Sequence, residues 1–238
     1  MSQFRIYVTG FTVILGLSLG VAEAAGVPVI DESFDALPQG YTLIEDSSEN
    51  ATASLQIGNV DGSNALIFDG TWSVPVNGQE YSLGALAPEL LTVDDFQFDP
   101  VDTDGITSIQ MKLDVEVTSN TMTPPQQGIF VQLSIYQLRP DGYVNFFSDN
   151  GSNGNFIQAG QSEALDLTFD LSHFPADSFG DRPDFGVNAL PMSFGLVFGA
   201  AYPRNPPLPN PINLDGRMTG DNWVVEVTGN GIFKDSLE

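Results

Sequence analysis

The two-residue alternation of apolar and polar side chains is the feature that most constrains the fold of this chain. Between residues 109 and 118, every odd position is apolar and every even position is polar. Successive side chains of a β-strand point to opposite faces, so the pattern predicts a strand with one buried and one wet face. Related alternation returns at 129–136, 165–172 and 192–199, and no segment keeps a helical period over three turns. The sequence therefore predicts an all-β protein.

Turn residues separate the predicted strands. Arg139-Pro140-Asp141-Gly142 combines a proline that fixes φ with a glycine that accepts positive φ, which predicts a β-hairpin leading into 143–147. We expect 109–117 and 129–135 to lie in one antiparallel sheet. Other strands are predicted at 27–34, 41–45, 53–57, 65–68, 72–76 and 223–227. About ten to twelve strands favour a single-domain antiparallel β-sandwich, or jelly roll, over residues 25–238.

Two segments break the strand rhythm and are predicted to be long loops. They are residues 175–191 and the proline-rich run 202–217. Proline removes backbone donors from a sheet, so we expect the second loop to pack across one end of the sandwich or to cover an edge strand.

The first 24 residues have the pattern of a signal peptide. Arg5 precedes an apolar run at 6–21, and Ala22-Glu23-Ala24 places small residues at the positions that signal peptidase recognises. The run is shorter than the roughly 20 residues of a membrane-spanning helix, and no charged stop-transfer segment follows it. We therefore expect cleavage after Ala24, no membrane span in residues 25–238, and a secreted or periplasmic location.

Charge and cysteine content exclude several classes of function. The chain has 31 acidic residues, 7 Lys and Arg residues, a net charge of −24 and no cysteine. Binding to a phosphate backbone requires clustered Lys and Arg, so a nucleic-acid partner is excluded. The absence of cysteine excludes disulfides and thiolate sites, and in an exported chain of this length it favours a bacterial origin. The acidity fits either solubility in a salty medium or carboxylates that hold a divalent metal.

Loop carboxylates offer two interpretations. Calcium takes about six to eight oxygen ligands from bendable loops, but Asp, Asn and Gly also form turns without any metal. The segment Asp102-Thr103-Asp104-Gly105 matches only a fragment of an EF-hand loop and lies beside a predicted strand. The clusters are Asp99, Asp102 and Asp104; Asp149, Asn150, Asn153 and Asn155; Asp177, Asp181 and Asp184; and Asp215 with Asp221.

The order of four short motifs resembles secreted bacterial jelly-roll modules of the carbohydrate-binding and concanavalin-like kind. The motifs are Asp31-Glu32-Ser33-Phe34-Asp35, Thr168-Phe169-Asp170-Leu171-Ser172, Phe194-Gly195-Leu196-Val197-Phe198 and Gly220-Asp221-Asn222-Trp223-Val224-Val225. In that family the first and last strands lie side by side, and acidic residues near them often share a structural calcium. The resemblance implies a Ca²⁺ site with Asp221 as a ligand and Asp31 or Glu32 opposite it. The chain departs from the sugar-binding members because it has no obvious pair of exposed tryptophans.

The wet faces of the central strands supply the predicted ligand-binding surface. Sugars stack their C–H bonds on aromatic faces and pair their hydroxyls with amide or carboxylate side chains. An ordinary solvent face, or a face covered by the proline-rich loop, would explain the same pattern. The predicted binding residues are Gln110, Asp114, Glu116, Gln132, Tyr136, Tyr143, Asn145 and Phe147.

No catalytic residue is predicted. His173 is the only histidine, and Gly160-Gln161-Ser162-Glu163-Ala164 leads into a strand, unlike a nucleophile elbow. Asp114 and Glu116 share one strand face, as glycosidase carboxylates can, but simple alternation explains them as well.

The sequence favours a secreted, non-catalytic β-sandwich that binds an extracellular glycan or a cell-surface component, with Ca²⁺ in a structural role if the metal site exists. The alternatives are a glycan-active hydrolase or lyase on the same scaffold and a structural surface or matrix protein.

Overall fold

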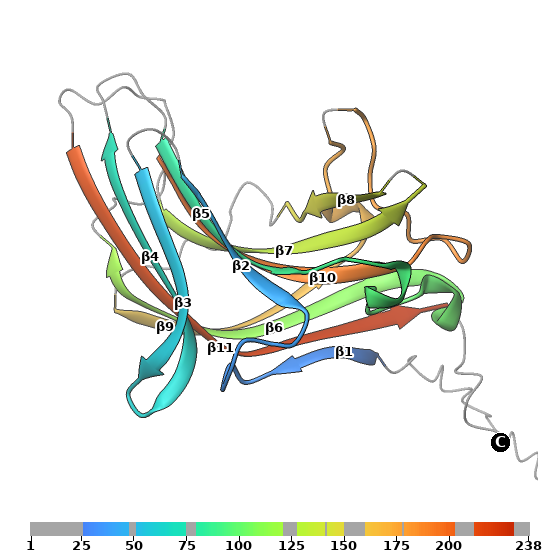
Figure 1. Ribbon diagram of the computed structural model, residues 1–238, viewed down its shortest axis with the longest axis horizontal. Coiled ribbons are helices and arrows are strands. Elements are labelled where there is room, and N and C mark those ends of the chain that lie inside the picture. Colours follow the sequence, from blue (N-terminus) through green and yellow to red (C-terminus); the bar gives the residue numbers. More distant parts are fainter. Residues whose placement is uncertain are drawn as a thin grey trace, which may run out of the picture.

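The fold is a sandwich of two antiparallel sheets. The computed structural model describes residues 26–47, 51–74, 80–120, 128–140, 142–149, 160–177, 179–202 and 212–230. Sheet A has the strand order β3-β4-β11-β6-β9, with β1 also paired to β11, and sheet B has the order β2-β5-β10-β7-β8 (Figure 1). Both sheets bend in the same direction, and sheet B lies on the inside of the bend (Figure 1). The predicted all-β antiparallel sandwich is confirmed.

The described residues form eleven strands and three short 3₁₀ helices. Within these ranges no helix is long and apolar enough to cross a membrane. The elements are β1 (Val27–Glu32), β2 (Tyr41–Ser47), β3 (Ala51–Val60), β4 (Ser63–Val74), β5 (Glu80–Pro88), η1 (Val93–Asp95), η2 (Pro100–Thr103), β6 (Ile106–Asn120), β7 (Gly128–Arg139), β8 (Gly142–Phe147), β9 (Gln161–Phe169), η3 (Leu171–His173), β10 (Met192–Tyr202) and β11 (Ile212–Gly229).

Aromatic rings between the sheets form the centre of the core. Trp223 is fully buried, stacks on Phe34 with ring centroids 6.4 Å apart, and meets the edge of Tyr41 at 5.9 Å. Phe68 of sheet A stacks on Phe198 of sheet B at 6.3 Å. Each such side chain contributes about 1.5–3 kcal/mol through burial.

Strand β11 organises sheet A. It pairs with β6 through residues 216–229, with β4 through residues 212–220 and with β1 through residues 223–227. The register shifts between Asp221 and Val224, and Asn222 has a φ of 53°. This bulge bends the strand at the point where its neighbour changes from β4 to β1. The first and last strands therefore lie side by side, as the family resemblance implies.

Three predictions from the sequence are wrong: one concerns the sheet to which two strands belong, one the division of a strand and one the length of a loop. Residues 109–117 lie in β6 of sheet A, whereas 129–135 lie in β7 of sheet B. Alternation marks the buried face of a strand but not its sheet, because both sheets bury one face against the same core. Residues 65–68 and 72–76 were expected as separate strands, but pairing with β3 and β11 continues one strand, β4, through Asp69 and Gly70. The predicted loop 202–217 is too long, since β11 begins at Ile212.

The predicted hairpin and the first predicted loop are confirmed. Arg139 pairs with Gly142 at the turn between β7 and β8. Residues 175–177 and 179–191 contain no helix or strand. Gln137 holds this loop: its Nε2 donates to the carbonyls of Asp184, at 2.8 Å, and Leu190, at 3.2 Å, while its Oε1 accepts from Asp184 N at 2.7 Å. Only 1% of Gln137 is exposed, so these bonds are shielded from water.

Replacing Gln137 with alanine is expected to lower the free energy of unfolding by about 2–3 kcal/mol, because it leaves buried backbone groups without partners. Urea denaturation measures the effect. Gln56→Ala on the edge strand β3 is the control, since Gln56 is exposed, and a change within about 0.5 kcal/mol is expected. Equal effects of the two variants would contradict the role of Gln137.

Candidate functional site

The structure divides the predicted binding residues between opposite faces of the sandwich. Cross-strand partners share a face of an antiparallel sheet, so the registers place each side chain. Three of the eight lie on the outer face of sheet A: Gln110, Asp114 and Glu116. The other five lie together on the outer face of sheet B: Gln132, Tyr136, Tyr143, Asn145 and Phe147.

The outer face of sheet B carries no long side chains along its central strand, β10. Outward positions of β10 hold Ser193, Gly195, Val197 and Gly199, whereas Phe194, Leu196 and Phe198 point into the core. No large side chain therefore rises from the middle of this face.

Rings from β7 fill the space above the glycines of β10. A Cβ built on Gly195 would lie 2.5 Å from Ser134 Oγ and 2.9 Å from Tyr136 Cε2, and one on Gly199 would overlap the ring of Phe130. Glycine in a strand interior commonly marks such a close approach. The rings lie down on the sheet and make an aromatic floor.

The neighbouring strand β8 adds exposed aromatic side chains to this floor. Tyr136 is 6% exposed, whereas Tyr143 is 50% exposed and lies with its ring centroid 5.9 Å from that of Tyr136. Phe147, which is 44% exposed, lies two residues beyond Asn145 on the same face of β8, opposite Ser134. Two aromatic faces are thus accessible beside a buried one.

A shallow hollow crosses all five strands of sheet B. Its cavity volume is about 150 Å³, which is smaller than the roughly 300–1,000 Å³ of pockets that enclose a small molecule. A ligand here would lie across the hollow instead of entering it. The lining residues are Ile44, Asp46, Leu83, Ala85, Tyr136, Asn145, Phe147 and Val197.

Polar groups within the hollow are few. Asn145 Oδ1 is buried and has no hydrogen-bond partner among the described residues. Burial raises the pKa of the Tyr136 phenol, and the nearby Ser134 side chain offsets part of that rise. Tyr136 is therefore protonated at neutral pH. Gln132 lies on the same face, where its Nε2 donates to Ser148 O at 3.0 Å.

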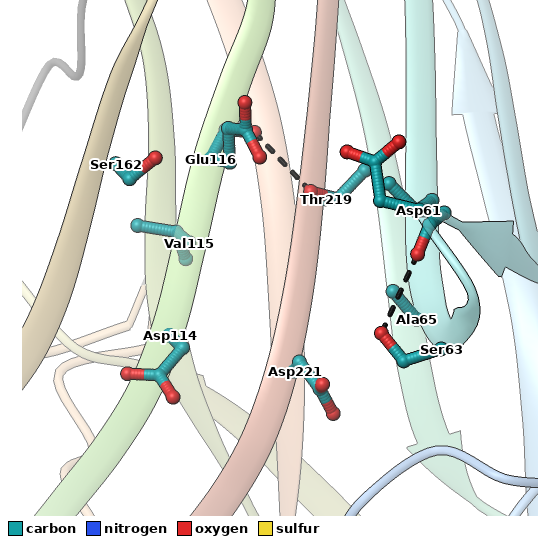
Figure 2. Close-up of a pocket in the computed structure, with 10 residues that line it drawn as sticks. Asp61, Ser63, Ala65, Asp114, Val115, Glu116, Ser162, Thr219 and Asp221 are labelled. Atoms are coloured by element: carbon teal, nitrogen blue, oxygen red, sulfur yellow. Dashed lines mark hydrogen bonds between the residues drawn. The ribbon is translucent and has the colours of Figure 1, made fainter.

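A second hollow, of about 240 Å³, lies on the outer face of sheet A (Figure 2). Asp114 and Glu116 come from β6 and Asp221 from β11, while Asp61 comes from the β3–β4 turn. Thr219 Oγ1 donates to Glu116 O at 3.5 Å. No aromatic side chain is among the described residues that line this hollow. It is an acidic depression without a stacking surface.

The predicted calcium ligands lie on β1 and on β11. Asp31 pairs with Val224 and Glu32 with Trp223, so these successive residues point to opposite faces of β1. Asp221 pairs with Asp114 and accepts from Asn222 N at 2.8 Å. In the described part of the chain, no group of three or more Asp, Glu or His residues could hold a metal ion. Calcium binding by these residues stays a prediction.

Three of the other loop carboxylates serve as turn and cap acceptors. Asp99 Oδ1 accepts from Val101 N at the start of η2. Asp177 Oδ1 accepts from both Phe179 N and Asp181 N, each at 2.8 Å. Asp184 Oδ1 accepts from Gly186 N at 2.9 Å. The cluster around Asn150, Asn153 and Asn155 lies outside the described residues.

His173 also has a local structural role. Its Nδ1 accepts from Asp170 N at 3.1 Å at the start of η3, and its ring meets the edge of Phe169 at 6.0 Å. These contacts account for the only histidine of the chain.

Sequence reasoning missed five of the eight residues that line the hollow, namely Ile44, Asp46, Leu83, Ala85 and Val197. The spacing of Gly195 and Gly199 within a predicted strand was a usable signal, because it marks a face approached by other side chains. The pairing of β2 with β5, and of β5 with β10, joins distant segments and had no local signal.

The fold has solved counterparts. No protein-family model matches the chain, and no curated protein matches it in sequence. A family 11 carbohydrate-binding module from Clostridium thermocellum, in complex with a β-1,3-1,4-mixed-linked tetrasaccharide, is 11% identical, with a TM-score of 0.42 over 86% of this chain and 98% of that one. The family 11 module of the cellulosomal cellulase Lic26A-Cel5E of that organism is 10% identical, with a TM-score of 0.39 over 87% and 96% of the two chains.

A third structure belongs to a study of promiscuous specificity in carbohydrate-binding modules of the β-sandwich superfamily. It is 10% identical, with a TM-score of 0.41 over 81% of this chain, and the match spans 60% of that structure's length. The likeness to these structures is one of overall fold, at TM-scores of 0.39 to 0.42.

Gly195→Ala is expected to lower the free energy of unfolding by about 1–3 kcal/mol, because the new Cβ collides with Ser134 Oγ and with the carbonyl of Leu86. Gly58→Ala is the matched control: its Cβ would meet only the flexible Ile67 side chain, so a change of about 0.5 kcal/mol or less is expected. Denaturant unfolding of both variants measures the difference, and equal stability would contradict the close packing over Gly195.

Proposed function

We propose that this protein is a secreted, non-catalytic glycan-binding protein whose binding surface is the outer face of sheet B. The observation that carries the proposal is the pair of exposed rings, Tyr143 and Phe147, on either side of Asn145 along β8. Aromatic faces receive the C–H bonds of a sugar ring, and an amide between them can both donate to and accept from hydroxyls. This face therefore has the two kinds of group that sugar recognition needs.

The shape of the face supports a polymeric ligand. The hollow runs from Ile44 on the edge strand β2 to Phe147 on the opposite edge strand β8. Five strands at about 4.8 Å spacing make a face about 19 Å wide. A shallow depression of that width, on the inside of the bend in Figure 1, suits an extended chain of sugars lying across the strands.

The chemistry of the hollow supports binding without turnover. Glycoside hydrolysis uses two carboxyl groups roughly 5–10 Å apart. Asp46 is the only carboxylate among the described residues that line the hollow, so this site has no such pair. The hollow on sheet A has several carboxylates but no aromatic face on which a sugar could stack.

Replacing Phe147 or Tyr143 with alanine is expected to weaken glycan binding at least tenfold each, because each removes an accessible stacking face. Affinity electrophoresis through gels containing soluble polysaccharides, together with depletion from solution by insoluble ones, measures binding. Circular dichroism checks that the variants are folded.

Phe179→Ala is the matched control, since Phe179 is 89% exposed in the loop between η3 and β10 and lies outside the hollow. Unchanged binding is expected for this variant. If the protein binds none of a broad set of polysaccharides, or if all three alanine variants lose binding equally, the proposed function is wrong.

A further inference from the structure

The charges of the molecule are divided unequally between its two outer faces. Among the described residues that line the hollow of sheet B, Asp46 is the only charged one, and the outward positions 130, 132, 134 and 136 of β7 are uncharged. The hollow of sheet A contains Asp61, Asp114, Glu116 and Asp221. The binding face is thus nearly neutral, while the opposite face is strongly acidic.

No described cation serves the hollow of sheet B. Arg139 follows the outward positions of β7 but points to the other side, where its guanidinium lies 5.7 Å from the centre of the Phe146 ring and donates to Arg182 O. On sheet A, Lys112 lies 3.5 Å from Glu226 and Arg217 lies 3.5 Å from Asp69. Among the described residues that line the hollow of sheet B, a negatively charged ligand would find no Lys or Arg side chain with which to pair.

The charged group of the hollow is a hydrogen-bond acceptor that needs a donor. The Asn145 amide carries both donors and an acceptor, whereas the Asp46 carboxylate has only acceptor oxygens. A sugar hydroxyl donates to such atoms. A uronate carboxylate, a sulfate or an ionised phosphate offers mainly further acceptors, and it would also meet the field of a chain with a net charge of −24.

We infer that the ligands of this face are neutral glycans and that Asp46 acts as a specificity-determining residue that rejects carboxylated, sulfated or phosphorylated polymers. The inference rests on the proposed function. Asp46 accepts hydrogen bonds from sugar hydroxyls on one side of the hollow, the Asn145 amide pairs with hydroxyls on the other side, and the Tyr143 and Phe147 rings stack on the sugar.

The test compares each neutral polymer with its own carboxylated form. The probes are cereal β-glucan, galactomannan and amylose, each beside a sample whose primary hydroxyls are oxidised to carboxylates, with alginate and polygalacturonate as natural anionic polymers. We expect binding to at least one neutral polymer and at least tenfold weaker binding to its oxidised form at low salt. The difference in affinity between the neutral polymer and its oxidised form should become smaller in 1 M NaCl, because the electrostatic screening length falls to about 3 Å.

Two acid-to-amide variants test whether Asp46 causes the discrimination between neutral and oxidised polymers. Asp46→Asn should reduce the ratio of the affinity for the neutral polymer to the affinity for the oxidised polymer at least threefold, because the substitution removes the charge in the hollow. Glu163→Gln makes the same change in net charge on β9 of sheet A, at an exposed position, and should leave the ratio unchanged.

The outcomes separate this inference from the proposed function. Preference for an oxidised or natural anionic polymer that is lost in Phe147→Ala would overturn the neutral-glycan inference while leaving glycan binding at this face intact. Equal effects of Asp46→Asn and Glu163→Gln would overturn the role of Asp46. No binding to any polymer would overturn the proposed function and the inference together.

Discussion

The unequal packing on the two sides of β10 is the constraint on which the rest of the structure depends. Its inward residues Phe194, Leu196 and Phe198 are fully buried in the core between the sheets, while its outward positions carry only small or medium side chains. Because the outward glycines leave space above the backbone, rings from β7 lie down over β10. One strand thereby supplies the centre of the core and the floor of the candidate binding face.

The same sandwich presents two chemically different surfaces. Acidic residues gather on the outer face of sheet A, where water and counter-ions solvate them and their mutual repulsion keeps molecules apart. Sheet B is left with exposed aromatic side chains and one carboxylate in its hollow. In a chain with a net charge of −24, the two faces thus differ in the ligands that they could contact: sheet A would repel anions, and the proposed binding face of sheet B is nearly neutral.

Local patterns in the sequence predicted the class of fold but not the arrangement of the sheets. Alternation identified the buried face of β6, and Pro140 and Gly142 identified the β7–β8 turn, because both signals act between near neighbours. The separation of β6 and β7 into different sheets depends on pairing with β11 and β10, which comes from distant segments. For that reason five of the eight predicted binding residues lie on the outer face of sheet B, whereas the other three lie on the outer face of sheet A. Asp46 was missed because its position depends on pairing with Leu83 of β5.

The most direct test of the central claim is to map the contact face by NMR. Backbone amide shifts of the labelled protein would be followed during titration with an oligosaccharide from a polymer that it binds. If the outer face of sheet B is the binding face, the largest shift changes will fall at Tyr136, Asn145 and Phe147, while the amide shifts of residues around Asp114 and Asp221 stay unchanged. Largest changes on sheet A, with β7 and β8 unaffected, would contradict the claim.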